Sequence, residues 1–510
     1  MTHKLFNKNL LLALPFIFVG CSNKTETTTA FCNHILINNK PSLSKELDAF
    51  SEISKTRTGV FVLEDGNSSM VSRAWLCENA EQSIDIQYFI FSTDNVGLIA
   101  CDYLVRAADR GVKIRLLIDD ILIDAAIEDV LTLNSHPNIE IKIYNPGVNL
   151  GKSIYSKVKT FVTDFRGANQ RMHNKTFNVD GKVAITGGRN IADEYFDYDH
   201  HYNFRDRDVL LLGKEVNAVT KSFKEFWASP ISVSVVTLVD KNTLIAYTEN
   251  TFKKLHEYAC NPANFWPQIR KQINQLPLAF KTIKTSGEFI WVDEVQFVSD
   301  IPGKNSAKKG LGGGGLSTSK LIELVENAKH SIDIQTPYLI TTELSEALFS
   351  KAIKRGVQIK ILTNSLASTD NLEAFSSYQS NRENLLKTGV QIFEFKPDAA
   401  IRKTLMTGKL HKEVTNFPIF GLHAKTMVID DSITVIGTFN LDPRSANLNT
   451  ECITIINSKV ISKKVLQGIE EEFKPENAWE ITSAFNPDSE VNKLKRIKTW
   501  TRKIIPKEIL

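Results

Sequence analysis

Two copies of one polar motif are the residues best suited to chemistry in this chain. Each copy has a histidine, a lysine two positions later and an aspartate five positions after the lysine: His173, Lys175 and Asp180, then His423, Lys425 and Asp430. On a β-strand, residues two apart point to the same face. An imidazole can attack phosphorus while a neighbouring ammonium neutralises the non-bridging oxygens. The motif therefore predicts chemistry on a phosphate ester.

A second pattern follows each motif and supports the same chemistry. Gly187 begins a Gly-x-x-Asn sequence that ends at Asn190, and Gly437 begins another that ends at Asn440. Glycine allows the backbone to approach an anion closely, and an asparagine amide can donate to a phosphoryl oxygen. A lone His-x-Lys pair is usually a surface feature. The duplication of the pair together with its Gly-x-x-Asn sequence makes the pattern specific, and Asn190 and Asn440 become candidate phosphate ligands.

The repeat extends beyond these motifs. The sequence SIDIQ begins at Ser83 and again at Ser331, which is 331 − 83 = 248 residues later. The sequence RGV begins at Arg110 and again at Arg355, 355 − 110 = 245 residues later, and the two motif histidines are 423 − 173 = 250 residues apart. Three matches in one order at nearly one offset indicate a duplicated domain.

The pattern within each half predicts helices alternating with strands. In the first half, the apolar run 84–91 predicts a strand, and a helix is expected to end at Arg110, with Gly111 as its stop. The β-branched run 114–118 predicts a second buried strand. This alternation is typical of an α/β layered fold. Residues 214–281 are helix-like with several aromatic side chains, and we expect them to link the halves.

Composition narrows the range of partners. The chain has 510 residues, of which 42% are hydrophobic and 24% charged, a length that suits two domains. Lys and Arg number 62 against 58 for Asp and Glu, a formal net charge of +4. Nucleic-acid enzymes are usually more basic because phosphate neutralisation supplies most non-specific affinity. The balance argues against a nucleic-acid partner.

The first residues are typical of an export signal. Lys4 and Lys8 precede the apolar run 10–19, which is too short to span a bilayer, and Cys21 follows a sequence like a bacterial lipoprotein cleavage box. Cys21 is therefore the expected lipidation site, and a plain secretory signal is the alternative. The expected domains are a signal peptide at 1–20, a tether at 21–45, a first domain at 46–213, a helical connecting segment at 214–290, a second domain at 291–480 and a basic amphipathic tail at 481–510.

Three further features have alternative interpretations. The chain has six cysteines and no CxxC sequence, so the usual zinc spacing is absent, and a disulfide at Cys32 stays open. His200 and His201 follow two aspartates, where a solvated loop is favoured over a metal site. The segment from Gly310 to Gly315 has five glycines and lacks the sequence of a phosphate-binding loop, so we expect a mobile loop near the junction of the halves.

These motifs resemble the paired HKD signature of the phospholipase D superfamily. The surrounding sequence resembles its cardiolipin synthase C-like branch at IDD (118–120), RMHNK (171–175), GGRNI (187–191), LTNSL (362–366) and GTFNLDPRSAN (437–447). The resemblance covers about residues 50–510. It implies two phospholipase D-like domains, each a mixed sheet flanked by helices, packed with pseudo-two-fold symmetry so that both His-Lys pairs share one site.

The resemblance also implies roles for individual residues. His173 would be the nucleophile that forms a phosphatidyl-histidine, and His423 the acid and base. Glu451 and Asp206 would orient the catalytic histidines. The remaining residues of the motifs would stabilise the transition state (Lys175, Lys425, Asn190 and Asn440) or order the turn after the strand (Asp180 and Asp430). Neither a metal nor another cofactor is expected.

The implied substrates are phospholipids at a membrane surface. The leading hypothesis is cardiolipin synthesis by phosphatidyl transfer; the alternatives are hydrolysis to phosphatidic acid, a nuclease, or a non-catalytic envelope lipoprotein. We expect a monomer with both half-sites in one chain, an activating partner protein in some members of the branch, and a location on the periplasmic side of the inner or outer membrane. Residues 493–505 mix basic and apolar side chains, as in a helix that lies either on a membrane surface or in solvent.

Overall fold

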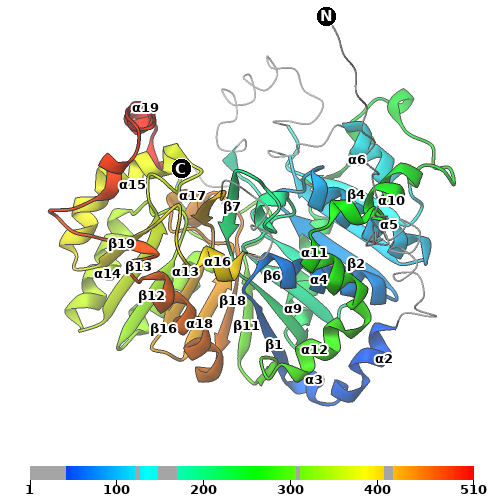
Figure 1. The fold of residues 1–510 in the computed structure, drawn as a ribbon, viewed down its shortest axis with the longest axis horizontal. Coiled ribbons are helices and arrows are strands. Elements are labelled where there is room, and N and C mark those ends of the chain that lie inside the picture. The colour runs from blue at the N-terminus through cyan, green and yellow to red at the C-terminus, as the bar shows by residue number, and fades with distance from the viewer. Residues whose placement is uncertain (1–41, 121–126, 148–168, 306–310, 407–416) are drawn as a thin grey trace, which may run out of the picture.

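Two mixed β-sheets lie side by side with helices over them (Figure 1). The computed structural model describes residues 42–120, 127–147, 169–305, 311–406 and 417–510. The expected signal peptide, the lipidation site at Cys21 and nearly all of the tether lie outside the described residues, as does Gly310. No helix among the described residues is long and apolar enough to cross a membrane.

The first sheet has nine strands in the order β10-β1-β8-β6-β5-β2-β3-β4-β9. The neighbours β2, β3 and β4 are parallel, and all other pairs are antiparallel. Its strands are β1 (Thr58–Leu63), β2 (Ser83–Tyr88), β3 (Lys113–Asp119), β4 (Ile139–Tyr144), β5 (Thr176–Val179), β6 (Val183–Gly187), β8 (Asp208–Gly213), β9 (Ser232–Ser234) and β10 (Ile290–Val292). Its helices include α4 (Gly66–Asn79), α5 (Asn95–Asp109) and α6 (Ile127–Asn134).

The second sheet repeats this plan with eight strands in the order β11-β18-β17-β16-β12-β13-β14-β19. Here β12, β13 and β14 are the parallel neighbours. Its strands are β11 (Val295–Ser299), β12 (Ser331–Gln335), β13 (Gln358–Asn364), β14 (Gln391–Phe395), β16 (Thr426–Ile429), β17 (Ile433–Gly437), β18 (Cys452–Asn457) and β19 (Ala478–Ile481). Its helices include α13 (Leu316–Asn327), α14 (Glu343–Lys354), α15 (Leu372–Lys387), α17 (Pro443–Asn447) and α18 (Lys459–Glu472). The expected duplicated α/β fold is confirmed.

The first repeat extends further than the expected boundary at residue 213. Helix α9 (Val216–Ala228) corresponds to α18, and β9 pairs antiparallel with β4 as β19 pairs with β14. The intervening segment therefore begins after β9, and its helices α10 (Lys253–Ala259), α11 (Pro267–Asn274) and α12 (Ala279–Thr285) pack on α4 and α5 of the first half. The aromatic residues of α9, which indicated a linker, instead bury that helix: Phe223 and Phe226 are fully buried.

An apolar layer joins the two halves. It combines side chains from strands of both sheets with residues of α9 and α18, all buried together: Val60, Ala184, Val209, Leu211, Val216, Val219, Val292, Phe297, Val428, Ile436, Cys452, Ile456, Ile461, Val465 and Ile469. Apolar burial is the main favourable term in such association. The halves therefore form one body, which can hold a site at their junction.

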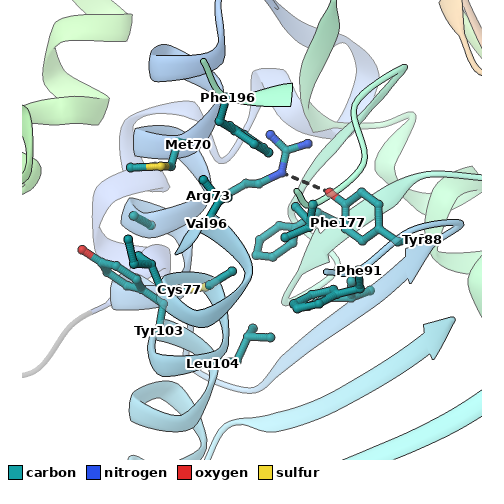
Figure 2. Close-up of a pocket in the computed structure, with 15 residues that line it drawn as sticks. Met70, Arg73, Cys77, Tyr88, Phe91, Val96, Tyr103, Leu104, Phe177 and Phe196 are labelled. Carbon is teal, nitrogen blue, oxygen red and sulfur yellow. Dashed lines mark hydrogen bonds between the residues drawn. The ribbon is translucent and has the colours of Figure 1, made fainter. Parts of the chain in front are cut away.

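A cavity of about 40 Å³ lies between α4, α5 and the first sheet (Figure 2). Its lining is almost entirely apolar, but Arg73 points across it, and its Nε donates to the Tyr88 hydroxyl at 3.0 Å. Arg73 also binds the Asp208 carboxylate, which accepts from the backbone N–H of Arg189 at 3.2 Å. This network supports the first Gly-x-x-Asn turn from within the core.

Candidate active site

A short cross-half pairing positions His173, which lies three residues before β5. The backbone N–H of His173 donates to the Thr450 carbonyl at 2.9 Å, and that of Thr450 donates to the Arg171 carbonyl at 2.9 Å. The next residue, Glu451, lies with its Oε2 2.9 Å from His173 Nδ1. On the other side, Asp119 at the end of β3 accepts from the N–H of Met172 at 2.7 Å. The histidine is thus fixed on both sides.

The second histidine is held by the equivalent arrangement. Strand β15 (Ile419–Leu422) pairs in parallel with β7 (Tyr202–Arg205) of the first half. The N–H of His423 donates to the Arg205 carbonyl at 2.8 Å, and Asp206 Oδ2 lies 2.6 Å from His423 Nδ1. Asn364, at the end of β13, binds both backbone groups of Leu422 at 2.8 Å. Asn364 and Asp119 therefore occupy corresponding positions.

The orienting carboxylates cross between the halves. Glu451 of the second half contacts His173 of the first, and Asp206 of the first half contacts His423 of the second. With Nδ1–H directed at a carboxylate, the Nε2 lone pair of each imidazole is left for the reaction. The family resemblance indicated that both carboxylates orient histidines; the exchange requires the parallel pairing described above.

Both lysines are buried beside the histidines. Lys175 Nζ donates to the His173 carbonyl at 2.9 Å, and Lys425 Nζ donates to the His423 carbonyl at 2.6 Å. Burial, with the repulsion of Lys425, lowers the pKa of Lys175 to about 7, and burial lowers the pKa of Lys425 to about 8. The two ammonium groups are close enough to repel each other, so an anion at this site would relieve the repulsion and favour their charged forms.

The same burial keeps the histidines neutral. Burial and the charges of Lys175 and Lys425 hold the pKa of His173 well below its usual range, and burial with Lys425 lowers the pKa of His423 to about 3. The carboxylates differ from each other: burial raises the pKa of Glu451 to about 7. Burial also opposes ionisation of Asp206, but His423 and Lys425 outweigh it and hold the pKa of that carboxyl below its ordinary value.

The asparagines of the two Gly-x-x-Asn turns differ in their hydrogen bonds. Asn190 accepts from the N–H of Ile90 at 3.1 Å and donates to the Tyr195 hydroxyl at 2.9 Å. Asn440 has a buried carboxamide oxygen with no hydrogen-bond partner among the described residues. At Gly188 a Cβ would lie 2.0 Å from Asp206 Oδ1, so the glycine makes room for the orienting carboxylate.

Asp180 and Asp430 do not meet the histidines. Asp180 accepts from the backbone N–H groups at the start of β2, those of residues 81–83, at 2.8 to 2.9 Å. Asp430 accepts equivalently from the N–H groups of residues 329–331, before β12. Both have positive φ, 54° and 50°. Their contacts order the turn, so the structure gives no support for placing them among the groups that act on substrate.

Several residues of the site carried no assigned role in the sequence. The ring of Phe89 packs edge-on against His173 with centroids 4.9 Å apart, and that of Tyr195 packs against His423 at 5.1 Å. Thr438 and Ser445 donate to the two oxygens of Glu451 at 2.5 and 2.7 Å. Phe89 and Thr438 come just after the apolar strands β2 and β17, which was a usable signal, but nothing in the spacing of the four residues identified the atom that each contacts.

The remaining candidates lie apart from these contacts. His200 is exposed and packs near Trp266, with ring centroids 6.0 Å apart, and His201 is exposed as well. In the described part of the chain, no three His, Cys, Asp or Glu side chains cluster as a metal site. Gly314 lies just before α13. Its carbonyl accepts from Asn305 and its N–H donates to Asn447 of α17, so the end of the glycine-rich segment is attached to α17.

The duplicated sheets and the paired site define a two-motif enzyme of the phospholipase D superfamily. Residues 76–227 and 321–477, more than half of the chain, match the family described as cardiolipin synthase, PLD-like domain. The chain belongs to that family, which confirms the resemblance drawn from its motifs, and it is an enzyme of the phosphatidyltransferase type.

Named relatives and a solved structure agree with this placement. The chain is 33% identical over 417 residues to cardiolipin synthase C of Escherichia coli (strain K12), covering 80% of this chain and 83% of that protein. It is 30% identical over 471 residues to an uncharacterized protein of Helicobacter pylori (strain J99), covering 89% of each. The crystal structure of phosphatidylserine synthase from Haemophilus influenzae matches with a TM-score of 0.55 at 14% identity, covering 91% of this chain and all of that one, which shows a shared fold.

Proposed function

We propose that this enzyme makes cardiolipin by transferring a phosphatidyl group from one phospholipid to a hydroxyl group of another, through a phosphatidyl-histidine at His173. The observation that carries the proposal is the crossed pair of contacts, His173 with Glu451 and His423 with Asp206, beside two buried lysines. The family relationship and the similarity to cardiolipin synthase C support the choice of substrate.

In the first step His173 Nε2 attacks the phosphorus of the donor lipid. An N–P bond forms, and the bond from phosphorus to the headgroup oxygen breaks. The anionic phosphate of the bound donor favours the imidazolium form of His423, which gives its Nε2 proton to the leaving oxygen. Lys175 and Lys425 neutralise the non-bridging oxygens, and Glu451 stabilises the positive charge that develops on the attacking imidazole.

In the second step the hydroxyl oxygen of the acceptor phosphatidylglycerol attacks phosphorus from the position that the headgroup has left. The N–P bond breaks, and His423 Nε2 removes the hydroxyl proton, which restores both residues to their starting forms. Water as the acceptor would give phosphatidic acid instead. The choice between transfer and hydrolysis thus depends on which acceptor reaches this position.

Product analysis tests the proposal. The full chain is incubated with vesicles of phosphatidylglycerol and phosphatidylethanolamine in the presence of a chelator, and the lipids are analysed by mass spectrometry beside His173→Ala. Cardiolipin from the wild type alone supports the proposal, and a phosphatidyl adduct on a peptide containing His173 identifies the nucleophile. Phosphatidic acid without cardiolipin would establish a hydrolase, and an adduct on His423 would reverse the two roles.

We further propose that the enzyme acts as a lipoprotein on the periplasmic side of a bacterial envelope membrane. The cleavage box before Cys21 supports this location. Cys260 is disulfide-bonded, whereas Cys77, Cys101 and Cys452 are free. A structural disulfide favours an oxidising compartment such as the periplasm. Metabolic labelling with a radioactive fatty acid tests the anchor, because the label should be lost in Cys21→Ser.

A further inference from the structure

We propose that helix α19 (Lys493–Thr501) and its flanking residues dock on an anionic phospholipid surface and bring the mouth of the active site to that surface. The proposal rests on the proposed function for the identity of the substrate, but docking can be measured without turnover. We call the surface concerned the apolar ridge. It consists of five side chains that are 46% to 87% exposed: Phe485, Leu494, Ile497, Trp500 and Ile504.

The ridge follows helical geometry. Leu494, Ile497 and Trp500 recur every three residues along α19, and Ile504 follows in the next turn, so the side chains share one face. Single exposed apolar residues are ordinary on a protein surface, whereas a contiguous group rimmed by polar residues marks an interaction site. The ridge is such a group, and it holds five of the large hydrophobic side chains that the described chain exposes.

The opposite face of α19 is fixed to the second half. Thr499 is buried, Lys495 Nζ donates to the Ala367 carbonyl at 3.3 Å, and Arg502 Nε donates to Glu373 at 2.5 Å. These contacts place the helix on the segment between β13 and α15 and on the first turn of α15. The helix is therefore a firmly placed element with one outward apolar face, which is the arrangement expected of an interfacial helix.

Charge identifies the surface that fits the ridge. Lys493, Arg496 and Lys503 line an open hollow of about 860 Å³ together with Phe485, Ile497 and Trp500. The acidic side chain in this hollow, Asp488, is bound by Arg382 at 2.9 Å and by Gln379 at 2.8 Å, so its charge is compensated. Basic side chains around an apolar strip complement an anionic lipid headgroup layer. A two-fold contact with a second copy would instead face these basic residues with one another.

The ridge is linked to both halves of the active site. The segment that supports α19 includes Asp370, which accepts from the Tyr338 hydroxyl at 2.8 Å and lies close enough to Lys425 to interact electrostatically. Beyond α19, the carbonyls of residues 509 and 510 accept from Arg444 at 3.0 Å, and the charge of Arg444 contributes to the lowered pKa of His173.

The position of the helix agrees with these links. In Figure 1, α19 projects at one corner of the upper edge of the molecule. Strand β7, which positions His423, points toward the same edge. A membrane lying against the ridge would therefore also lie along the edge of the molecule toward which β7 points. Docking would hold the active site at the depth of the phospholipid headgroups.

Vesicle binding tests the proposal. The full chain with Cys21→Ser, which prevents acylation, is titrated with vesicles of phosphatidylcholine alone or mixed with phosphatidylglycerol. Trp500→Ala combined with Ile504→Ala should weaken binding to the mixed vesicles by about 100-fold, because two large apolar side chains no longer enter the lipid. Leu278→Ala combined with Val460→Ala is the matched control, since it removes two exposed apolar side chains far from α19 and should leave affinity unchanged.

A second pair of variants and an activity measurement separate the possible outcomes. Lys493→Glu combined with Arg496→Glu should remove the preference for phosphatidylglycerol. Turnover of a short-chain phospholipid dissolved as monomers should remain at the wild-type level in the ridge variants, whereas turnover in vesicles should fall with affinity. If the wild type turns over neither substrate but binding still depends on the ridge, the proposed function fails and docking stands. Unchanged vesicle affinity, or loss of a dimer in the ridge variants, would overturn the docking proposal.

Discussion

Asp206→Asn is the substitution that most sharply separates the roles of the two histidines. The carboxylate is fully buried, its Oδ2 lies 2.6 Å from His423 Nδ1, and the two come from opposite halves. Asparagine has nearly the same shape, and its carboxamide oxygen can still accept from Nδ1–H. The change therefore removes the negative charge beside His423 and keeps this hydrogen bond, while the amide NH2 replaces Oδ1, which accepts from the Arg207 N–H at 2.7 Å, so that second hydrogen bond is lost.

The expected effect follows from the electrostatic energy of the pair. Charges about 4 Å apart at an effective dielectric constant of about 20 interact by about 4 kcal/mol. That energy is available only when His423 is an imidazolium, because neutral imidazole has no charge to stabilise. Each ~1.4 kcal/mol added to an activation free energy slows a step tenfold. Steps whose transition state contains His423 as an imidazolium should therefore slow by about 10³-fold.

Two substrates reveal which step is affected. Phosphatidylglycerol has a poor leaving group that needs a proton from His423, whereas a phosphatidyl ester of p-nitrophenol does not. With the nitrophenyl ester, Asp206→Asn should give a burst of nitrophenol at nearly the wild-type rate, followed by turnover slowed about 10³-fold. Glu451→Gln is the comparison, because it acts on His173 and should slow the burst itself.

The same experiment can refute the reasoning. Equal loss of the burst and of turnover with both substrates would show that Asp206 supports the nucleophile, and the roles of His173 and His423 would then be exchanged. Thermal unfolding of Asp206→Asn and Glu451→Gln, compared with the wild type, checks that the loss is not caused by unfolding.

Three further predictions use the described contacts. Gly188→Ala should lower kcat by about 10² or more, because a Cβ there would displace the Asp206 carboxylate, and a normal kcat in the folded variant would contradict this. kcat/KM should fall as pH rises from about 7 to 9, since Lys175 and Lys425, with pKa values of about 7 and about 8, then lose their protons; a flat profile would exclude them as phosphate ligands. Asp430→Ala should lower the free energy of unfolding by about 1–3 kcal/mol in denaturant titrations while the kcat of the folded fraction stays unchanged.

The α/β architecture could be predicted from the sequence because its signals are local or repeated. The apolar runs at 84–91 and 114–118 correspond to β2 and β3, and Gly111 follows the first-half helix with a φ of +95°. The aromatic residues of α9 fit a linker as well as a helix between sheets, so the sequence did not show that the repeat continues past residue 213 to β9. Only the neighbouring strands, which are distant in sequence, distinguish the two.

The site could be predicted less completely, for a similar reason. The types and spacing of His173 and His423 predict that these are the reacting groups, and the family resemblance indicated that Asp206 and Glu451 orient histidines. Which carboxylate meets which histidine depends on pairing between strands more than 200 residues apart, such as β7 with β15. Such pairing leaves no periodic signal in either segment, so the crossed arrangement appears only in three dimensions.

The crossing also explains how a duplicated site can support unequal roles. Each histidine contacts a carboxylate from the other half, so neither half contains a complete His–carboxylate pair, and the apolar layer between the halves holds the two pairs together. The two carboxylates differ: Asp206 stays ionised beside Lys425, whereas burial brings the pKa of Glu451 to about 7. A permanent negative charge suits the histidine that must repeatedly gain and lose a proton. A carboxyl that shares its proton suits a histidine that attacks in its neutral form, so the difference favours His423 as acid and base and His173 as nucleophile.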